Sequence, residues 1–590
     1  MKSIEKLRAA STLQDVANIL GFEPKSLSYI LYIKPSTEKY IHFEISKRSG
    51  GKRLISAPYP NLKTLQKRLS NLLVECIADI NKTLKFKSSL SHGFKRKHSI
   101  ITNADSHRNK RYVFNIDLEN FFGTINFGRV RGFFITNRNF ELNPAVATVL
   151  AQIICHENAL PQGSPCSPIT SNIIGHILDI RLAAFARQVG CKYSRYADDL
   201  TFSTNKLNFP TEVAEPIAGG MHQWKVGKNL ADIICKTGFV INNAKTRLQY
   251  KDSRQVVTGL VVNSKINTRA EYRRTARAMV DRLLETGKFY RKFKKPDDSG
   301  NLVLTEEEGT LNQLNGILSF IYSVGIFNKK RIYRKLKTSD MSFSDKEKRK
   351  DIFKKLTSHE KTYQDFLLYK YFYSNPLPLI LCEGKTDLIY IKAAIRQLAV
   401  TYPQLVKKEG KGGVSCFSRT KTTGHILGLG EGGTDEFTKF MDMYWKVCKS
   451  ITTPGKTQPI ILLIDNDKGA NSIYGYIKNK TKPLYDNISL NKNTFIFIKE
   501  NFYVVPTPLT NEGKDTKIED FFDQSVLDTK LNGKTFNPSN EGVNDKTEYG
   551  KAYFAEHVVR KNEKQIDFSK FKPILDRISE VLAEHQNKPS

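Results

Sequence analysis

Two acidic segments in the first half of the sequence have the residue types that two-metal phosphoryl transfer requires. Asp117 ends a β-rich run, and Asp198 and Asp199 stand side by side at a predicted hairpin turn. This chemistry needs clustered carboxylates that hold two Mg²⁺ ions about 3.5 to 4 Å apart, one to activate the attacking oxygen and both to neutralise developing charge. An Asp-Asp pair at a turn is more often ordinary turn chemistry, so the surrounding elements must decide.

The elements around these aspartates predict an α+β sheet domain. Short apolar runs such as 112–116 and 255–260 alternate with helical stretches. Residues 191–195 and 200–203 flank the Asp-Asp pair as two strands, so adjacent strand tips would bring the three carboxylates together. Residues 42–57 alternate apolar and polar side chains around a glycine turn, which predicts a further hairpin with basic residues at its turn.

Three motifs follow one another in this part of the chain. They are the segment 117–122 with its leading aspartate, the Pro-Gln-Gly loop at 161–163 and the Tyr-Ala-Asp-Asp tetrapeptide at 196–199. Over about residues 25–335 the chain resembles reverse transcriptases. The resemblance implies a right-hand polymerase with fingers, palm and helical thumb. It also implies that Asp117 and Asp198 are the principal ligands of two Mg²⁺ ions and that Asp199 completes the cluster.

The same resemblance implies roles for further residues. Phe122 would lie beneath the sugar of the incoming dNTP and exclude a 2′ hydroxyl, with core packing as its alternative. Gln162 and Gly163 would contact the nascent base pair. Lys245 would protonate the leaving pyrophosphate, or else be a solvated lysine. Arg53 would contact the triphosphate.

Two further segments resemble the retron group of reverse transcriptases: Asn-Ala-Asp-Ser-His at 103–107 and Val-Thr-Gly at 257–259. The resemblance implies a cognate structured noncoding RNA, on whose guanosine 2′ hydroxyl DNA synthesis starts, and a branched RNA-linked DNA product, msDNA. Asn103 and His107 would contact this RNA or simply pack. No acidic set in the sequence indicates a ribonuclease H domain, so a host ribonuclease H is expected to remove the template.

The charge of the chain favours a polyanionic partner. Ninety-three Lys and Arg against 59 Asp and Glu give a formal net charge of +34, which would make nucleic-acid binding strongly salt-dependent. Residues 269–337 are predicted to form a basic helical thumb. Arg269, Arg273 and Arg277 recur every four residues and lie on one stripe, suited to a nucleic-acid backbone or to a solvated helix face.

Two apolar strands in the C-terminal third also end in acidic residues. Residues 379–382 precede Glu383, and residues 460–464 precede Asp465 and Asp467. In a parallel α/β sheet, functional groups gather at the carboxyl ends of strands, which predicts a Mg²⁺ site. The alternative is that the two aspartates only cap a strand-to-helix turn.

Residues 377–525 resemble the TOPRIM domain of topoisomerases, primases and nucleases. The resemblance implies that Glu383 is a general acid or base and that Asp465 and Asp467 hold one or two Mg²⁺ ions. Asp387 would be a second-site ligand. Glu519, in a segment similar to that of the overcoming-lysogenisation nucleases, would be another ligand.

A nuclease-like effector is the expected role of this domain. Neither a tyrosine-bearing topoisomerase cleavage domain nor a primase zinc module is identified in the sequence. As in retrons that defend bacteria against phage, the msDNA would restrain or guide the effector, an arrangement of the toxin–antitoxin kind. The effector's substrate (RNA or DNA), its trigger and any homo-oligomer stay undetermined from sequence.

The whole chain is predicted to be multidomain, α+β followed by α/β, because its 590 residues exceed one ordinary core. Eight cysteines without Cys-x-x-Cys spacing predict reduced thiols. Neither a signal stretch nor a run of about 18 apolar residues is found, so a cytoplasmic protein without membrane contact is expected. The expected parts are 1–268 (fingers and palm), 269–337 (thumb), 338–376 (charged linker), 377–525 (TOPRIM-like) and 526–590 (extension of unknown role).

Two other interpretations stay open. The chain could be an intron-derived or abortive-infection reverse transcriptase, whose gene would lack a neighbouring structured RNA. It could also be a noncatalytic RNA-binding scaffold that has kept the fold. The presence of Asp117, Asp198 and Asp199 argues against the scaffold.

Overall fold

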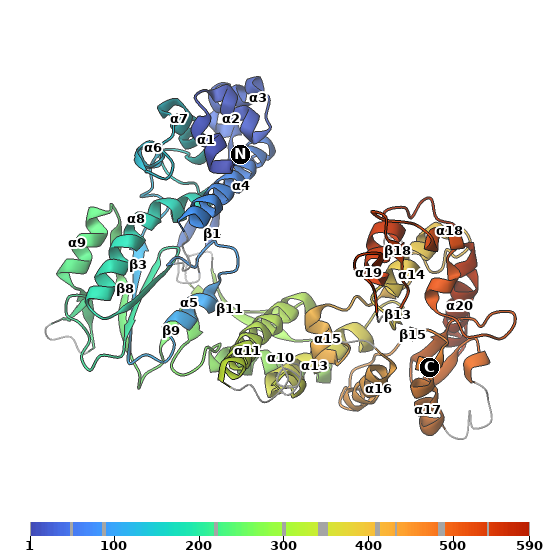
Figure 1. The fold of residues 1–590 in the computed structure, drawn as a ribbon. Helices are drawn as coiled ribbons and strands as arrows, with labels where there is room; N and C mark the ends of the chain where they lie inside the picture. The colour runs from blue at the N-terminus through green and yellow to red at the C-terminus, as the bar shows by residue number, and fades with distance from the viewer. Residues whose placement is uncertain are drawn as a thin grey trace. The chain divides into compact units, whose positions relative to one another are not determined.

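A computed structural model describes most of the chain, in two compact units (Figure 1). The first unit comprises Met1–Tyr272, Phe293–Thr305 and Ser323–Ser342, and the second comprises Arg273–Lys292, Glu306–Tyr322 and Phe343–Ser590. The described residues are 2–47, 51–84, 90–217, 222–297, 302–339, 352–407, 413–430, 433–481, 490–539 and 542–588.

A four-stranded antiparallel sheet forms the centre of the first unit (Figure 1). The strand order is β4-β5-β3-β8, so the strand predicted to carry Asp117 is internal. Val113, Phe114 and Ile116 on β3 are buried, because this strand is covered on both faces. The strands are β3 (Tyr112–Glu119), β4 (Lys192–Tyr196), β5 (Asp199–Thr204) and β8 (Val240–Tyr250).

Helices and small two-stranded sheets complete the first unit. The predicted hairpin at 42–57 is confirmed as β1 (Tyr40–Ser46) paired with β2 (Lys52–Pro58), with His42 opposite Ser56. The α-helices that share a hydrophobic core with the four-stranded sheet are α1 (Ser3–Ala9), α2 (Leu13–Leu20), α3 (Pro24–Ser28), α4 (Pro60–Thr83), α6 (Phe127–Thr136), α7 (Pro144–Ile154), α8 (Ser167–Gln188) and α9 (Lys228–Lys236).

Helix α8 has the length and apolar composition of a membrane span, the one such helix among the described residues. A core helix of a soluble protein meets the same criteria. In α8, 56% of the 18-residue apolar segment that meets them is buried. Its Asp179 is buried and pairs with Arg195 of β4. In this structure α8 packs as a core helix.

The region predicted as a helical thumb contains two helices and a hairpin. The hairpin was not predicted, and these elements are divided between the two units. They are α10 (Ala270–Thr286), β11 (Tyr290–Pro296), β12 (Leu302–Glu308) and α11 (Leu311–Ser339).

The second unit contains a five-stranded sheet of order β14-β13-β15-β17-β16, in which β16 alone of these strands pairs antiparallel. Leu381 and Leu462 face one hydrophobic cluster, whereas Ile380 and Ile461 face another. Burial on both faces explains why these strands are continuous apolar runs. The strands are β13 (Leu379–Cys382), β14 (Ser415–Cys416), β15 (Ile460–Ile464), β16 (Ile496–Lys499) and β17 (Phe502–Pro506).

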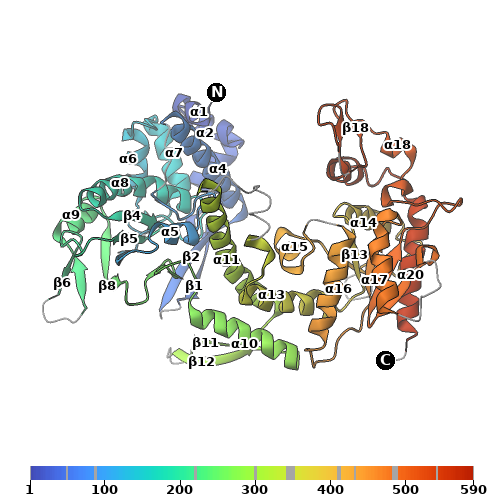
Figure 2. The ribbon, with the colours of Figure 1, turned by 60° about the horizontal axis from the view of Figure 1, so that its bottom comes forward.

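Helices pack against this sheet (Figure 2). Phe440 and Ile473 lie in one of the two clusters, and Tyr390 and Ile574 lie in the other, so both faces are covered by helices. The sheet is therefore the centre of an α/β layer structure. The helices are α14 (Asp387–Gln397), α16 (Thr434–Cys448), α17 (Asn471–Lys480) and α20 (Lys572–Gln586).

Parts of the predicted linker and extension belong to this unit. Within the predicted linker, α13 (Ser358–Leu368) and the turn at Tyr369–Tyr373 bury Phe366 and Phe372 in the same cluster as α16. Residues 340–351 of that linker lie outside the described residues. Helix α20, from the predicted extension, packs in the opposite cluster. Both segments therefore contribute to the core.

Candidate functional site

The antiparallel sheet brings the three predicted aspartates together. Asp117 on β3 lies directly opposite Asp199 on β5. Asp198 occupies the β4–β5 turn, and its carbonyl accepts a hydrogen bond of 3.0 Å from the Leu118 amide. Strand pairing thus makes neighbours of carboxylates that are some eighty residues apart in the sequence.

A buried ion pair holds the turn that carries Asp198. Arg195 is fully buried and donates to both carboxylate oxygens of Asp179, each at 2.8 Å. It also donates to the Ala197 carbonyl at 3.0 Å. Ala197 has φ of 56°, a conformation that is unfavourable without such support. Arg195 is therefore a positioning residue for the aspartates.

The pKa values of the carboxyls show how strongly the site concentrates negative charge. Burial raises the pKa of Asp199 to about 6, and Asp198 and Asp117 add to the effect by repulsion. Burial also raises the pKa of Asp198, while Lys245 and Arg53 lower it. Crowded, partly desolvated carboxylates are the oxygen ligands that Mg²⁺ prefers, so these residues fit a divalent cation.

Lys245 and Asn242, both on β8, contact Asp117. The Lys245 Nζ lies 3.0 and 3.1 Å from the two carboxylate oxygens, and the Asn242 amide donates to Oδ1 at 3.2 Å. The sequence interpretation missed Asn242, which stands opposite Asp117 in the β3–β8 register. Together they orient the carboxylate of Asp117.

The predicted nucleotide-contacting residues line the same region. The Phe122 ring is partly buried and meets Phe94 and Phe121 edge-on, with centroids 6.2 and 5.7 Å apart. Arg53 is exposed on β2, near enough to influence the Asp198 carboxyl. Their roles toward a nucleotide stay predictions.

The Gln162 loop is fastened to β2. The Gln162 carbonyl accepts a hydrogen bond of 2.8 Å from the Ser56 amide. Gly163 has φ of +133°, and a Cβ there would lie 2.7 Å from the Ser56 carbonyl oxygen. This close approach explains why the position is glycine.

The structure corrects the suggested RNA contacts of Asn103 and His107. Both side chains are fully buried. The His107 ring lies between the hydroxyls of Ser194 and Ser203, 2.7 Å from each, and Asn103 Oδ1 accepts from Ser194 at 2.6 Å. Both residues pack against the sheet, which was the alternative interpretation.

The arginine stripe lies where a helix was expected. Arg269 precedes α10, and Arg273 and Arg277 lie within it. Arg269 and Arg277 are exposed and Arg273 is half-buried, with Arg277 also 3.6 Å from Asp281. Their contact with a nucleic-acid backbone stays a prediction.

A second acidic group lies at the carboxyl ends of β13 and β15. These strands are parallel neighbours, so the Asp465 amide reaches the Glu383 carboxylate at 3.3 Å. Asp465 also accepts from the Ile518 amide at 2.9 Å, which places the short helix Ile518–Phe521 beside it. Asp387, the first residue of α14, accepts from the Gly384 amide at 2.6 Å.

Charge is strongly concentrated here too. Burial raises the pKa of Asp465 to about 8, with repulsion from Asp387 and Glu519 next in importance. Burial likewise raises the pKa of Glu383 to about 6 and raises that of Glu519. These carboxyls fit a bound cation, because a cation would relieve their repulsion.

Asp467 and Glu519 each have a partner of their own. Asp467 caps the short helix Lys468–Ala470 by accepting from the Gly469 amide at 2.8 Å, so the capping alternative is confirmed for this aspartate. Asp465 instead accepts from Ile518, the first residue of a different short helix, Ile518–Phe521. Glu519 pairs with Lys551 at 3.0 Å, a residue from the predicted extension that carried no sequence signal.

Comparison with known proteins finds relatives of the part of the chain that carries the three aspartates. Residues 45–286 match the family "Reverse transcriptase (RNA-dependent DNA polymerase)". The retron Mx65 reverse transcriptase of Myxococcus xanthus is 34% identical over 46% of this chain and 62% of its own length, and retron Mx162 of the same organism is 31% identical over 54% and 64%. The retron Ec86 enzyme of Escherichia coli is 28% identical over 55% and 88%.

This chain thus spans less than two thirds of the two Myxococcus relatives. Among solved structures, a telomerase from Candida albicans aligns over 56% of this chain and 64% of its own, at 11% identity and a TM-score of 0.30. The family match covers the part that carries the three aspartates. Over residues 45–286 the chain thus matches the reverse transcriptase family, and it is similar to retron reverse transcriptases.

Proposed function

We propose that the protein is a retron reverse transcriptase that copies a structured noncoding RNA into branched msDNA. The observation that carries the proposal is the cluster of Asp117, Asp198 and Asp199 on one sheet, inside the segment that matches reverse transcriptases. The formal charge of +34 suits an RNA template and a DNA product.

In this proposal the three aspartates hold two Mg²⁺ ions, which when bound activate the primer hydroxyl and neutralise charge on the triphosphate. Arg53 pairs with the triphosphate, and Phe122 excludes ribonucleotides beneath the sugar. Lys245, next to Asp117, gives a proton to the departing pyrophosphate. Gln162 and Gly163 support the nascent base pair.

The test is to sequence the nucleic acid that copurifies with the protein when it is expressed with its flanking genomic DNA. Wild type should carry one structured RNA with covalently branched DNA, and Asp198→Asn should carry the RNA alone. The same RNA should be trimmed by a host ribonuclease H. DNA of equal amount in both preparations would refute the polymerase, and random cellular RNA would favour the scaffold alternative.

We further propose that the second unit is a TOPRIM-like Mg²⁺-dependent nuclease that acts as an antiphage effector. The supporting observation is the adjacency of Glu383 and Asp465 at the ends of two parallel strands, with Asp387 and Glu519 close enough to raise the Asp465 pKa. Glu383 would transfer protons while the aspartates hold the ion.

Cell viability tests this second activity. Expression without functional msDNA, in an Asp198→Asn background, should be toxic, and Glu383→Gln or Asp465→Asn should remove the toxicity. Asp435→Asn is the matched control, because Asp435 is an exposed acid on α16 of the same unit. Toxicity that survives both site variants would remove the effector role and leave the polymerase proposal untouched.

A further inference from the structure

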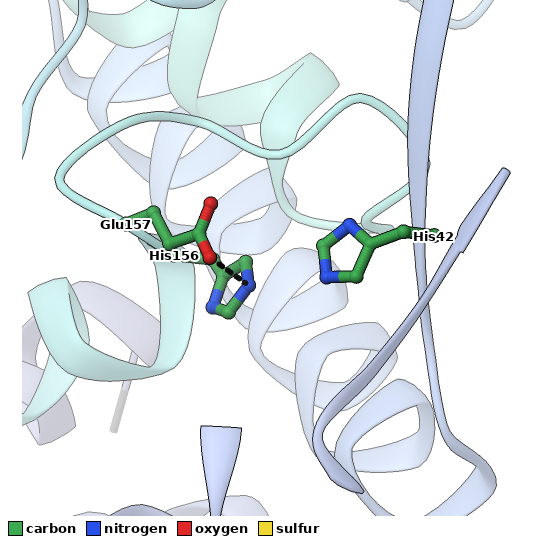
Figure 3. A group of neighbouring side chains, drawn as sticks. All are labelled: His42, His156 and Glu157. Carbon is green, nitrogen blue, oxygen red and sulfur yellow. Dashed lines mark ion pairs between the residues drawn. The ribbon is translucent and has the colours of Figure 1, made fainter. Parts of the chain in front are cut away.

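Three side chains that polymerisation does not use converge beside the β1–β2 hairpin of the first unit (Figure 3). They are His42, His156 and Glu157, and one ligand atom from each lies within 4.8 Å of the others. His42 comes from β1, whereas His156 and Glu157 follow the end of α7. Figure 3 shows the His156 ring between the Glu157 carboxylate and the His42 ring.

The His156 ring carries a buried nitrogen without a partner. Its side chain is only 8% exposed, and Nε2 has no hydrogen bond among the described residues. Buried polar atoms are normally satisfied, so an orphan of this kind points to a missing ligand. Glu157 Oε1 lies 3.7 Å from Nε2, too far for a hydrogen bond. Two ligands of one tetrahedral zinc, with bonds of about 2.0 to 2.2 Å, are about 3.3 Å apart.

The contacts of the His42 ring also suit a metal ligand. Its Nδ1 lies 3.1 Å from the hydroxyl of Ser56, the residue opposite it in the hairpin. When Nδ1–H donates to that oxygen, Nε2 is left with the lone pair that a metal ligand needs. Tyr40 stacks on His156 with ring centroids 4.1 Å apart, which fixes the plane of the second imidazole.

We propose that His42, His156 and Glu157 bind Zn²⁺ or a divalent first-row transition ion of similar preference. Two imidazoles and one carboxylate suit such ions, whereas Mg²⁺ prefers oxygen ligands, so the site is chemically distinct from the aspartate cluster. The fourth position is left to water or a small anion. A cavity of about 400 Å³, lined in part by Tyr40, Gln152 and His156, adjoins the site.

Such an ion would link the hairpin to the segment that leads into the Gln162 loop. Ser56 connects the two, because its hydroxyl meets His42 and its amide donates to the Gln162 carbonyl at 2.8 Å. An ion that binds the folded form stabilises it by mass action. The site would therefore fix the hairpin against the loop.

Titration of the chelator-treated full-length chain with ZnCl₂, in excess Mg²⁺, tests the proposal. Wild type should bind one ion at this site and melt at a higher temperature with Zn²⁺. His42→Ala and Glu157→Gln remove exposed side chains, so folding should survive. Each should weaken binding by more than the roughly 10- to 100-fold that loss of an outer hydrogen-bond partner causes. Ser56→Ala should fall within that range.

The controls are His222→Ala and Glu212→Gln, which remove exposed residues of the same types from the same unit and should leave binding unchanged. Replacing Zn²⁺ by Co²⁺ separates this site from the cysteines, because thiolate ligands give an intense charge-transfer band that imidazole and carboxylate do not. The proposal is overturned by the absence of Zn²⁺ binding in Mg²⁺, by full binding in His42→Ala, or by a thiolate band in place of weak ligand-field bands.

Discussion

Lys245 donates to both carboxylate oxygens of Asp117, at 3.0 and 3.1 Å, and is the cation nearest that carboxylate among the described ion pairs. The lysine side chain is 59% exposed, so the pair is a weak one that a competing charge can separate. A lysine held beside a carboxylate that is proposed to bind Mg²⁺ is well placed to turn to a leaving pyrophosphate. The contact thus supports the role that the family resemblance implies.

Replacing this lysine should slow chemistry more than it affects folding. We expect Lys245→Met to lower the single-turnover rate of dNTP addition by about 10²- to 10⁴-fold, as for loss of a general acid. The free energy of unfolding should change by no more than about 1 kcal/mol, because the pair is exposed. Lys251→Met, at an exposed position after β8, is the control. Equal rates in both variants would exclude the proton-transfer role.

The buried ion pair behind the turn that carries Asp198 should contribute strongly to stability. Arg195→Met leaves the Asp179 carboxylate buried without its cation and with the Tyr193 hydroxyl, at 2.8 Å, as its remaining side-chain donor, and we expect a loss of about 3 to 5 kcal/mol. The double variant Arg195→Met/Asp179→Leu should recover much of that loss, because both charges are gone. Denaturant unfolding measures both. Polymerase activity should stay low in the double variant, since Ala197 has lost its hydrogen bond.

The second acidic group should make stability depend on pH in the absence of metal. The pKa of Asp465 is about 8 in the folded chain against an ordinary 3.8, so the folded form binds the proton more tightly than the unfolded form. The stabilisation that protonated Asp465 contributes is therefore complete below the ordinary pKa of 3.8 and is lost as pH rises through about 8. Each unit of difference corresponds to about 1.4 kcal/mol at most.

This pH dependence can be measured in the full-length chain with a fluorescence signal that comes from the second unit only. In a Trp224→Phe background, fluorescence reports on Trp445, which belongs to that unit. With chelator present, the parent should be less stable at about pH 8.5 than at about pH 5, and Asp465→Asn should flatten the profile. Added Mg²⁺ should restore the parent at the higher pH. Asp435→Asn is the control and should keep the pH profile of the parent. If Asp465→Asn kept that profile as well, the assignment would be contradicted.

The sequence predicted what depends on local pattern. The continuous apolar runs at 379–382 and 460–464 indicated buried parallel strands, and the structure confirms them because both faces are covered. The aspartate cluster followed from motifs whose spacing implies strand pairing. Pairing between distant side chains that belong to no such motif could not be predicted. The ion pair between Glu519 and Lys551 depends on tertiary packing, which no residue spacing in the sequence indicates.

Burial of polar residues was also beyond the sequence. Asn103 and His107 lie in a helical segment with mixed composition, and their burial depends on the hydroxyls of Ser194 and Ser203 from the sheet. One signal was available and overlooked. Asp179 stands in a mostly apolar stretch, which predicts a buried partner such as Arg195.

The glycine of the Gln162 loop allows a last prediction. A Cβ at Gly163 would lie 2.7 Å from the Ser56 carbonyl oxygen, and φ of +133° is unfavourable for alanine. Gly163→Ala should therefore push the loop from β2 and disturb the nascent base pair. We expect the apparent affinity for dNTP and the rate of incorporation to fall together, and the melting temperature to fall as well.

Gly132→Ala provides the contrast that makes this result interpretable. Gly132 lies inside helix α6, and a Cβ there would have no neighbour within 4 Å. Alanine favours a helix over glycine by up to about 1 kcal/mol, so this variant should be as stable as wild type or more so, with full activity. If Gly163→Ala behaved like Gly132→Ala, the contact between the loop and Ser56 would not be what positions Gln162.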